Sequence, residues 1–211
     1  MIIEKCVVGV MATNCYLLTN QTSKETVIID PGAQFNIIKS KINNLQLKPV
    51  AILLTHGHFD HIMAAKELSN EFSIDIHVAK PEASVLSDSS LNCSNLIRQN
   101  FTLDADVLLE NNEIITLADI DIEVIYTPGH THGGACYYIK DQEVLFSGDT
   151  LFYESVGRTD FPTGDVRSLM HSISSQLLTL PESVKAYPGH GEETTIGHER
   201  ANNFFIQEYR R

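Results

Sequence analysis

Residues 53–61 read LLTHGHFDH, an apolar run followed by three histidines and an aspartate within six residues. Such a run is typical of a buried strand, and imidazole and carboxylate groups are costly to bury unless they are paired or bound to a metal. Side chains two residues apart in an extended segment point the same way, so His56 and His58 are suited to hold one ion. We expect Asp60 and His61, which follow as the chain turns into a helix, to reach a second ion. The alternative is a group of surface histidines in a polar turn.

The composition is typical of a soluble globular protein. With 211 residues, 43% of them hydrophobic, the chain can bury a sizeable core, and we expect a single domain over residues 1–211. No stretch approaches the ~18 unbroken apolar residues of a membrane span, and Glu4 and Lys5 stand where a secretory signal would be apolar. We therefore expect a cytoplasmic protein without a membrane partner, and the sequence leaves its oligomeric state open.

The charge and the cysteines argue against two kinds of site. The formal net charge is −12, with 15 lysines and arginines among 27 acids, and this balance disfavours nucleic acid as a partner. None of the four cysteines belongs to a CxxC pair, so we predict buried, reduced thiols rather than disulfides or metal ligands. These cysteines are Cys6, Cys15, Cys93 and Cys136.

Five short apolar runs each end in a turn that contains glycine together with aspartate or histidine. They are TVIIDPG (26–32), AILLTHG (51–57), EVIYTPGH (123–130), VLFSGD (144–149) and VKAYPGH (184–190). Each run predicts a buried strand that ends at its turn. If these strands lie side by side in sheets, their polar ends gather at one rim, where layered α/β proteins place ligand sites.

Amphipathic helices are predicted between these strands. The expected inward faces are Phe35, Ile38, Ile42 and Leu45 in residues 34–46, Ala64, Ala65, Leu68 and Phe72 in residues 61–72, and Val166, Leu169, Met170, Ile173 and Leu177 in a helix capped by Asp165. Residues 80–105 predict short helices and loop, either an ordinary surface connection or a lid over a site.

The remaining strand ends complete a ligand set. Two metal ions need more than four ligands, and His130, Asp149 and His190 each directly follow a glycine in PGH, SGD and PGH. Any one of them alone could be an ordinary turn residue. Together with the residues of the 53–61 stretch they make seven candidate ligands, and none is a cysteine.

These motifs resemble the metallo-β-lactamase superfamily, and the resemblance runs nearly end to end through IIDPG, THGHFDH, TPGHTHGG, FSGDTLF, GRTDFPTGD and YPGHGEETTIG. It implies a four-layer αβ/βα sandwich. Within the superfamily the match is to the short glyoxalase II-like group of thioester hydrolases. The ligands implied are His56, His58 and His130 for the first metal and Asp60, His61 and His190 for the second, with Asp149 as the bridge. Asp60 and Asp149 are the candidate catalytic residues.

The resemblance implies hydrolysis of a thioester such as S-2-hydroxyacylglutathione by a metal-bridging hydroxide. Two divalent ions, two aspartates and one hydroxide leave a net charge of about +1, which favours an anionic substrate. A bound metal lowers the pKa of water toward 7, and a thiolate leaves without an acid. We expect zinc. Iron and manganese stay as alternatives, because ligand type alone does not select among these metals.

Other residues have two readings from the sequence. Arg158 stands where related thioester hydrolases bind the substrate's peptide part, and it is equally suited to an ion pair with Asp160. Tyr153 and Phe152 either line the substrate pocket or fill the core. Asp30 either orients a ligand histidine or caps the DPG turn. His132 has the spacing to exchange roles with His130.

Two further functions stay open. Persulfide dioxygenases resemble this chain in fold, ligand positions and the GRTDF loop, and use a single iron ion; a non-catalytic metal-binding protein is the other alternative. Full-length glyoxalase II carries a helical C-terminal extension that helps to bind glutathione, whereas this sequence ends in one short helix at Arg210 and Arg211. The sequence therefore leaves open whether glutathione is part of the substrate.

Overall fold

The computed structural model describes residues 1–209, and Arg210 and Arg211, expected at the end of the last helix, lie outside the described residues. Its strands form two mixed sheets of six strands and one small ribbon. The first sheet has the order β1 (Ile2–Val8), β2 (Thr13–Thr19), β3 (Glu25–Ile29), β4 (Lys48–Leu54), β5 (Asp75–Ala79) and β6 (Val107–Leu109). The second has the order β14 (Thr194–Thr195), β13 (Lys185–Pro188), β10 (Val144–Gly148), β9 (Ala135–Ile139), β8 (Ile120–Tyr126) and β7 (Ile114–Leu117). The ribbon pairs β11 (Leu151–Phe152) with β12 (Ser155–Val156).

The helices are short. The α-helices are α1 (Phe35–Asn44), α2 (Phe59–Ile62), α3 (Ala65–Phe72), α4 (Ala83–Leu86), α5 (Val166–Ser175), α6 (Ile196–Asn202) and α7 (Phe204–Tyr209). The 3₁₀ turns are η1 (Lys80–Glu82), η2 (Ser94–Ile97), η3 (Lys140–Gln142) and η4 (Leu177–Thr179). No helix within residues 1–209 is long and apolar enough to cross a membrane.

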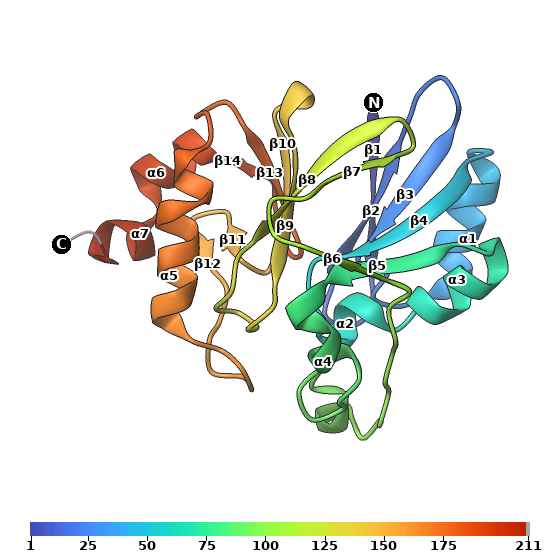
Figure 1. Ribbon diagram of the computed structural model, residues 1–211, viewed down its shortest axis with the longest axis horizontal. Coiled ribbons are helices and arrows are strands. Elements are labelled where there is room, and N and C mark those ends of the chain that lie inside the picture. Colours follow the sequence, from blue (N-terminus) through green and yellow to red (C-terminus); the bar gives the residue numbers. More distant parts are fainter. Residues whose placement is uncertain (210–211) are drawn as a thin grey trace.

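The two sheets pack face to face, with α1 and α3 outside the first sheet and α5, α6 and α7 outside the second (Figure 1). Period-two alternation along the central strands builds this arrangement. In β4, Ile52 and Leu54 enter the cluster under α1 and α3, while Leu53 enters the cluster between the sheets. In β10, Leu145 packs beneath α5. The α/β class and the four-layer αβ/βα sandwich are thus confirmed.

Strand prediction succeeded better than helix prediction. All five predicted strands are present, as β3, β4, β8, β10 and β13. The single helix predicted over 61–72 is instead the pair α2 and α3, because the N–H of Ala64 donates to the Pro31 carbonyl at 3.0 Å. Asp165 does cap α5, since its side chain accepts from the N–H of Ser168. Val166 is 57% exposed rather than inward, because the first turn of α5 borders an open hollow instead of the sheet. Leu45, also expected inward, is 42% exposed, because α1 ends at Asn44, one residue before it.

Two glycines with positive φ lie next to predicted ligands, Gly129 before His130 and Gly191 after His190. Substitutions at these glycines test how closely each turn packs against its neighbours. A Cβ atom on Gly129, whose φ is +139°, would lie 2.2 Å from the backbone nitrogen of Leu169 in α5. Gly191, with φ +74°, has no atom within 4 Å of such a Cβ. We expect Gly191→Ala to lower the free energy of unfolding by about 1 kcal/mol through backbone strain alone. Gly129→Ala should cost about 3 kcal/mol or more, because helix backbone must also move.

Chemical denaturation of the metal-free variants measures both changes. Equal losses from the two substitutions would contradict the packing of the turn after β8 against α5.

Candidate metal centre

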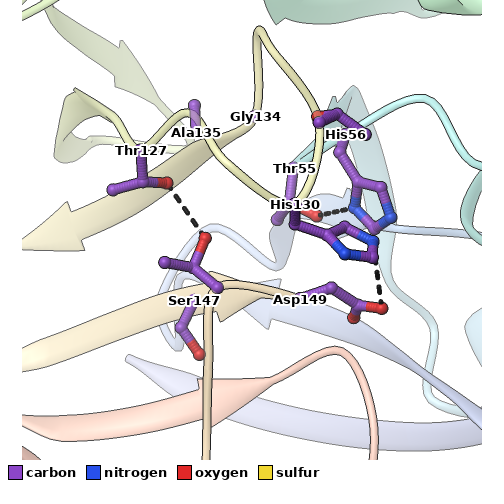
Figure 2. Close-up of a pocket in the computed structure, with 10 residues that line it drawn as sticks. Thr55, His56, Thr127, His130, Gly134, Ala135, Ser147 and Asp149 are labelled. Carbon is purple, nitrogen blue, oxygen red and sulfur yellow. Dashed lines mark hydrogen bonds and ion pairs between the residues drawn. The ribbon is translucent and has the colours of Figure 1, made fainter. Parts of the chain in front are cut away.

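The predicted ligands meet at one rim, where β4, β8, β10 and β13 end between the two sheets. The structure brings together all seven: His56, His58, Asp60, His61, His130, Asp149 and His190. Figure 2 shows three of them, His56, His130 and Asp149, around one hollow, with the Thr55 hydroxyl directed at the His56 ring. The fold therefore brings together the turns that the sequence analysis had grouped as one site.

A first group consists of three buried histidines, His56, His58 and His130. One nitrogen from each lies within 4.8 Å of the others, and Nδ1 of His58 is 2.9 Å from Nε2 of His130. Within residues 1–209, Nε2 of His56 and Nε2 of His58 are buried and have no hydrogen-bond partner. Buried polar atoms are normally satisfied, and neutral imidazole nitrogens are good ligands for divalent transition metals. This group therefore fits a metal ion.

A second group consists of Asp60, His61 and His190. Nε2 of His190 lies 3.2 Å from Oδ2 of Asp60 and 3.2 Å from Nε2 of His61. Asp60 also accepts a hydrogen bond of 3.0 Å from the hydroxyl of Thr13. Two histidines with one carboxylate form a second donor set suited to a divalent metal ion.

Asp149 lies between the two groups. Its Oδ2 is 3.6 Å from Nε2 of His130 in the first group and 3.5 Å from Nε2 of His190 in the second. Its Oδ1 is 3.4 Å from Nε2 of His61 and, among the described residues, has no hydrogen-bond partner. A carboxylate that faces both histidine groups in this way has the geometry of a shared ligand.

The two groups differ in protonation. Burial, together with the charges of neighbouring histidines, lowers the pKa of His56 well below its usual value and that of His58 to about 3. Burial alone would also lower the pKa of His61, but the carboxylates of Asp149, Asp60 and Asp30 raise it to about 10. In the metal-free protein at pH 7, His56 and His58 are thus neutral and ready to bind a cation, whereas His61 holds a proton.

Supporting hydrogen bonds fix the rings. Asp30 accepts from Nδ1 of His61 at 3.0 Å and from both the N–H and the hydroxyl of Thr55, so it orients a predicted ligand and holds the turn after β4. None of these recorded bonds caps the DPG turn of Asp30 itself. The carbonyl of Arg158 lies 2.8 Å from Nδ1 of His130, and the carbonyl of Met11 lies 3.1 Å from Nδ1 of His190. Acceptors of this kind set the tautomer that leaves the other ring nitrogen free for a metal.

Sequence analysis did not single out Glu82, which lies under the first group. The side chain is fully buried and accepts hydrogen bonds from the N–H of Gly57, the hydroxyl of Thr131 and the N–H of Gly133. Burial raises the pKa of Glu82 to about 7, although the three donors partly oppose the shift. It belongs to residues 80–105, where short helices were predicted without any sign of a buried carboxylate.

A cleft of about 350 Å³ opens beside both groups. Its lining includes Phe152 and Arg158, two of the predicted substrate-binding residues, together with five of the predicted ligands and apolar side chains such as Val156 and Phe161. Tyr153, the third predicted residue, is not part of this lining; it is half-exposed and stacks on His198 with ring centroids 5.0 Å apart.

His132 does not exchange roles with His130. Its Nε2 lies 3.2 Å from the hydroxyl of Ser84, outside both groups. Arg158 makes the ion pair that the sequence suggested, with two contacts of 2.7 Å to Asp160, while it also borders the cleft.

The contrast in protonation leads to a prediction about metal binding. A metal competes with protons for its ligands, and neighbouring carboxylates raise the pKa of His61 to about 10 and raise that of His190 above its usual value. Occupation of the group that contains these two histidines should therefore release at least one proton at pH 7, and its affinity should rise with pH up to about 10. His56 and His58 should release no proton when the first group is occupied, because the pKa of each is lowered. Zinc titration by calorimetry in buffers of different ionisation enthalpy measures the release. In a His61→Gln variant the release should fall by about one proton; equal release by both binding events in the unchanged protein would contradict the assignment.

Comparison with known proteins agrees with this geometry. A family model described as "Metallo-beta-lactamase superfamily" matches residues 8–190. The probable metallo-hydrolase YqgX of Bacillus subtilis is 38% identical to this chain, covering 94% of each protein. The hydroxyacylglutathione hydrolase GloC of Haemophilus influenzae is 35% identical and covers 97% of each.

Solved structures agree as well. The BLEG-1 B3 metallo-beta-lactamase is 41% identical, with a TM-score of 0.93 over 97% of this chain and 99% of that one. TTHA1623, solved in a di-iron-bound form, is 30% identical, with a TM-score of 0.85 over 96% and 99%. The family expected from the motifs is confirmed: the chain belongs to the metallo-beta-lactamase superfamily.

Proposed function

We propose that this protein is a dinuclear metal hydrolase that cleaves anionic acyl thioesters, of the S-2-hydroxyacylglutathione type or a related one. The observation that carries the proposal is the position of Asp149, whose carboxylate faces His130 on one side and His61 and His190 on the other. A shared carboxylate implies two ions held side by side. In the proposal His56, His58 and His130 hold one ion, and Asp60, His61 and His190 hold the other.

The ions and the chain have separate tasks in this proposal. Bound divalent ions supply an activated water at neutral pH and polarise a carbonyl. The chain keeps His56 and His58 unprotonated by burial. It also holds Asp60 ionised, because the charges of His61 and His190 lower the pKa of that carboxyl despite its burial. Phe152 and Phe161 give the cleft an apolar wall.

The cleft supports a thioester in particular. Apart from the predicted ligands, no carboxyl group and no lysine of the described residues lines it. Cys93 does line it, but burial raises the pKa of that thiol, so it is a poor proton donor. A thiolate leaves without protonation, whereas the amine or alkoxide released from an amide or ester needs an acid. The similarity to the hydroxyacylglutathione hydrolase GloC favours the same class.

A second candidate function is β-lactam hydrolysis, which the similarity to the BLEG-1 B3 metallo-beta-lactamase favours. Iron is an alternative to zinc, because TTHA1623 was solved with two iron ions. A protein with a single iron ion would instead fit the persulfide dioxygenase alternative from the sequence. These candidates differ in metal content and in substrate, so one set of measurements separates them.

The test combines metal analysis with a substrate panel. We expect about two zinc ions per chain and turnover of S-lactoylglutathione or a simpler acyl thioester, with slower or no turnover of a cephalosporin. Asp149→Ala should abolish hydrolysis and lower the metal content, because both groups lose their common carboxylate. His132→Ala is the matched control, since this exposed histidine contacts Ser84 outside both groups and its loss should change neither measurement. One iron per chain with oxygen uptake on a persulfide, or an Asp149→Ala variant at full rate, would overturn the proposal.

Arg158 offers a test of the charge preference. If its guanidinium attracts the substrate carboxylate, Arg158→Ala should raise KM for an anionic thioester roughly three- to tenfold, with kcat nearly unchanged. Asp160→Asn should lower the same KM, because it releases the guanidinium from its two contacts with Asp160. If Arg158 only fixes the loop through Asp160, the two substitutions should instead impair the enzyme alike. Steady-state kinetics with an anionic and an uncharged thioester decide between these outcomes. If Arg158 attracts the carboxylate, the uncharged substrate should respond to neither substitution; if Arg158 only fixes the loop, it should respond to both.

A further inference from the structure

We propose that Glu82 is a positioning residue that sets the metal affinity of the first group without touching the metal. The inference rests on the proposed ligand set, in which His56, His58 and His130 hold one ion. Those histidines come from two loops far apart in the sequence, and a metal ion binds well only if both loops present their rings at a fixed separation.

The carboxylate of Glu82 joins these two loops. Its Oε1 accepts a hydrogen bond of 2.8 Å from the N–H of Gly57, the residue between His56 and His58. Its Oε2 accepts bonds of 2.9 Å from the hydroxyl of Thr131 and 3.0 Å from the N–H of Gly133, in the loop that begins at His130. Each oxygen thus serves a different ligand loop.

The backbone around Glu82 packs as closely as its side chain binds. A Cβ atom on Gly133 would lie 2.3 Å from the backbone nitrogen of Glu82, and one on Gly57 would lie 2.9 Å from Cγ1 of Val85 in α4. The segment formed by η1 and α4 therefore packs tightly against both ligand loops, and a shift of either loop would require this segment to move. In Figure 1 this segment lies below the first sheet, beside α2.

The charge of Glu82 is costly in the metal-free protein. The side chain is 0% exposed, and no lysine or arginine of the described residues forms an ion pair with it. A buried carboxylate without a cation is destabilising unless its hydrogen bonds offset the loss of water. All three side-chain bonds recorded for Glu82 go to the ligand loops, so the position of those loops is what this buried charge secures.

The second group has a separate support. Asp60 is held by Thr13, His61 by Asp30, and His190 by the Met11 carbonyl, and none of these contacts involves Glu82. Loss of the Glu82 carboxylate should therefore weaken one of the two metal-binding events and leave the other unchanged. A residue needed only for general stability would not discriminate between them.

The test is a calorimetric titration of the metal-free full-length protein with zinc. Glu82→Gln keeps the size of the side chain but turns an NH₂ group toward donors, so at least one of the three bonds is lost. We expect one binding event to weaken about 10- to 100-fold and the other to keep its affinity. Glu199→Gln is the matched control: Glu199 is equally buried and accepts bonds from the N–H of Glu154, the Thr194 hydroxyl and the Asn203 amide, none of which is in a ligand loop. It should change neither affinity.

Double variants identify the affected ion. Glu82→Gln should add little to the loss caused by His130→Ala, because both act on the first group, and should add fully to His190→Ala. If Glu82→Gln does not fold, Thr131→Val removes one donor and should weaken the same event to a smaller extent, with Thr131→Ser restoring it.

Two results separate the failures. A wild-type protein that binds no zinc would overturn the proposed function itself. Two bound ions in the wild type, with both affinities unchanged or equally reduced in Glu82→Gln, would overturn only the role of Glu82.

Discussion

The strand ends at the rim between the two sheets have to hold several ionisable groups at close range, and the rest of the structure serves that requirement. The His56 ring centroid lies 4.2 Å from that of His61 and 4.8 Å from that of His130. Groups this close cannot all be protonated, and they keep their spacing only on a rigid support. Strand β4 supplies it, because Leu53 is anchored between the sheets while Ile52 and Leu54 are anchored under the helices. Because β4 is packed on both faces, it holds the histidines that follow it, His56 and His58, in a fixed position.

The two donor groups solve the problem of buried charge in opposite ways. In the first group, burial and repulsion from neighbouring histidines keep His56 and His58 unprotonated, so Nε2 of each ring is available and has no hydrogen-bond partner among the described residues. The group with Asp60 and His61 instead surrounds one imidazole with carboxylates, which favour a cation there even when the only cation is a proton. The carboxylate of Asp149 faces both groups. A divalent ion in each group would take the place of the proton on His61, remove the repulsion between the imidazoles and provide a partner for the unpaired ring nitrogens.

Local spacing explains what could be predicted from the sequence. The i, i+2 placement of His56 and His58 and the glycine turns before the other ligands are short-range signals, and the alternating burial of the strands follows from the same periodicity. Glu82 was invisible because its partners Gly57 and Gly133 lie 25 and 51 residues away. Tyr153 was misleading for a related reason: it directly follows Phe152 at the end of β11, where neighbouring side chains point apart, so only Phe152 reaches the cleft.

The distribution of charge in the cleft bears on how substrates are selected. Arg158 is the one lysine or arginine among its described lining residues, and its charge is already compensated by Asp160 and stacked 3.8 Å over the Phe161 ring. A peptide with two carboxylates would therefore meet only one cationic side chain away from the metal groups, Arg158, and that side chain is already paired with Asp160. Under the proposed function, most of the attraction for an anion would then come from the bound metal ions, next to the scissile carbonyl. Binding energy at that place stabilises the transition state more than the remote part of the substrate, so in the proposed reaction the cleft would select for the chemistry of the acyl group more than for a particular thiol.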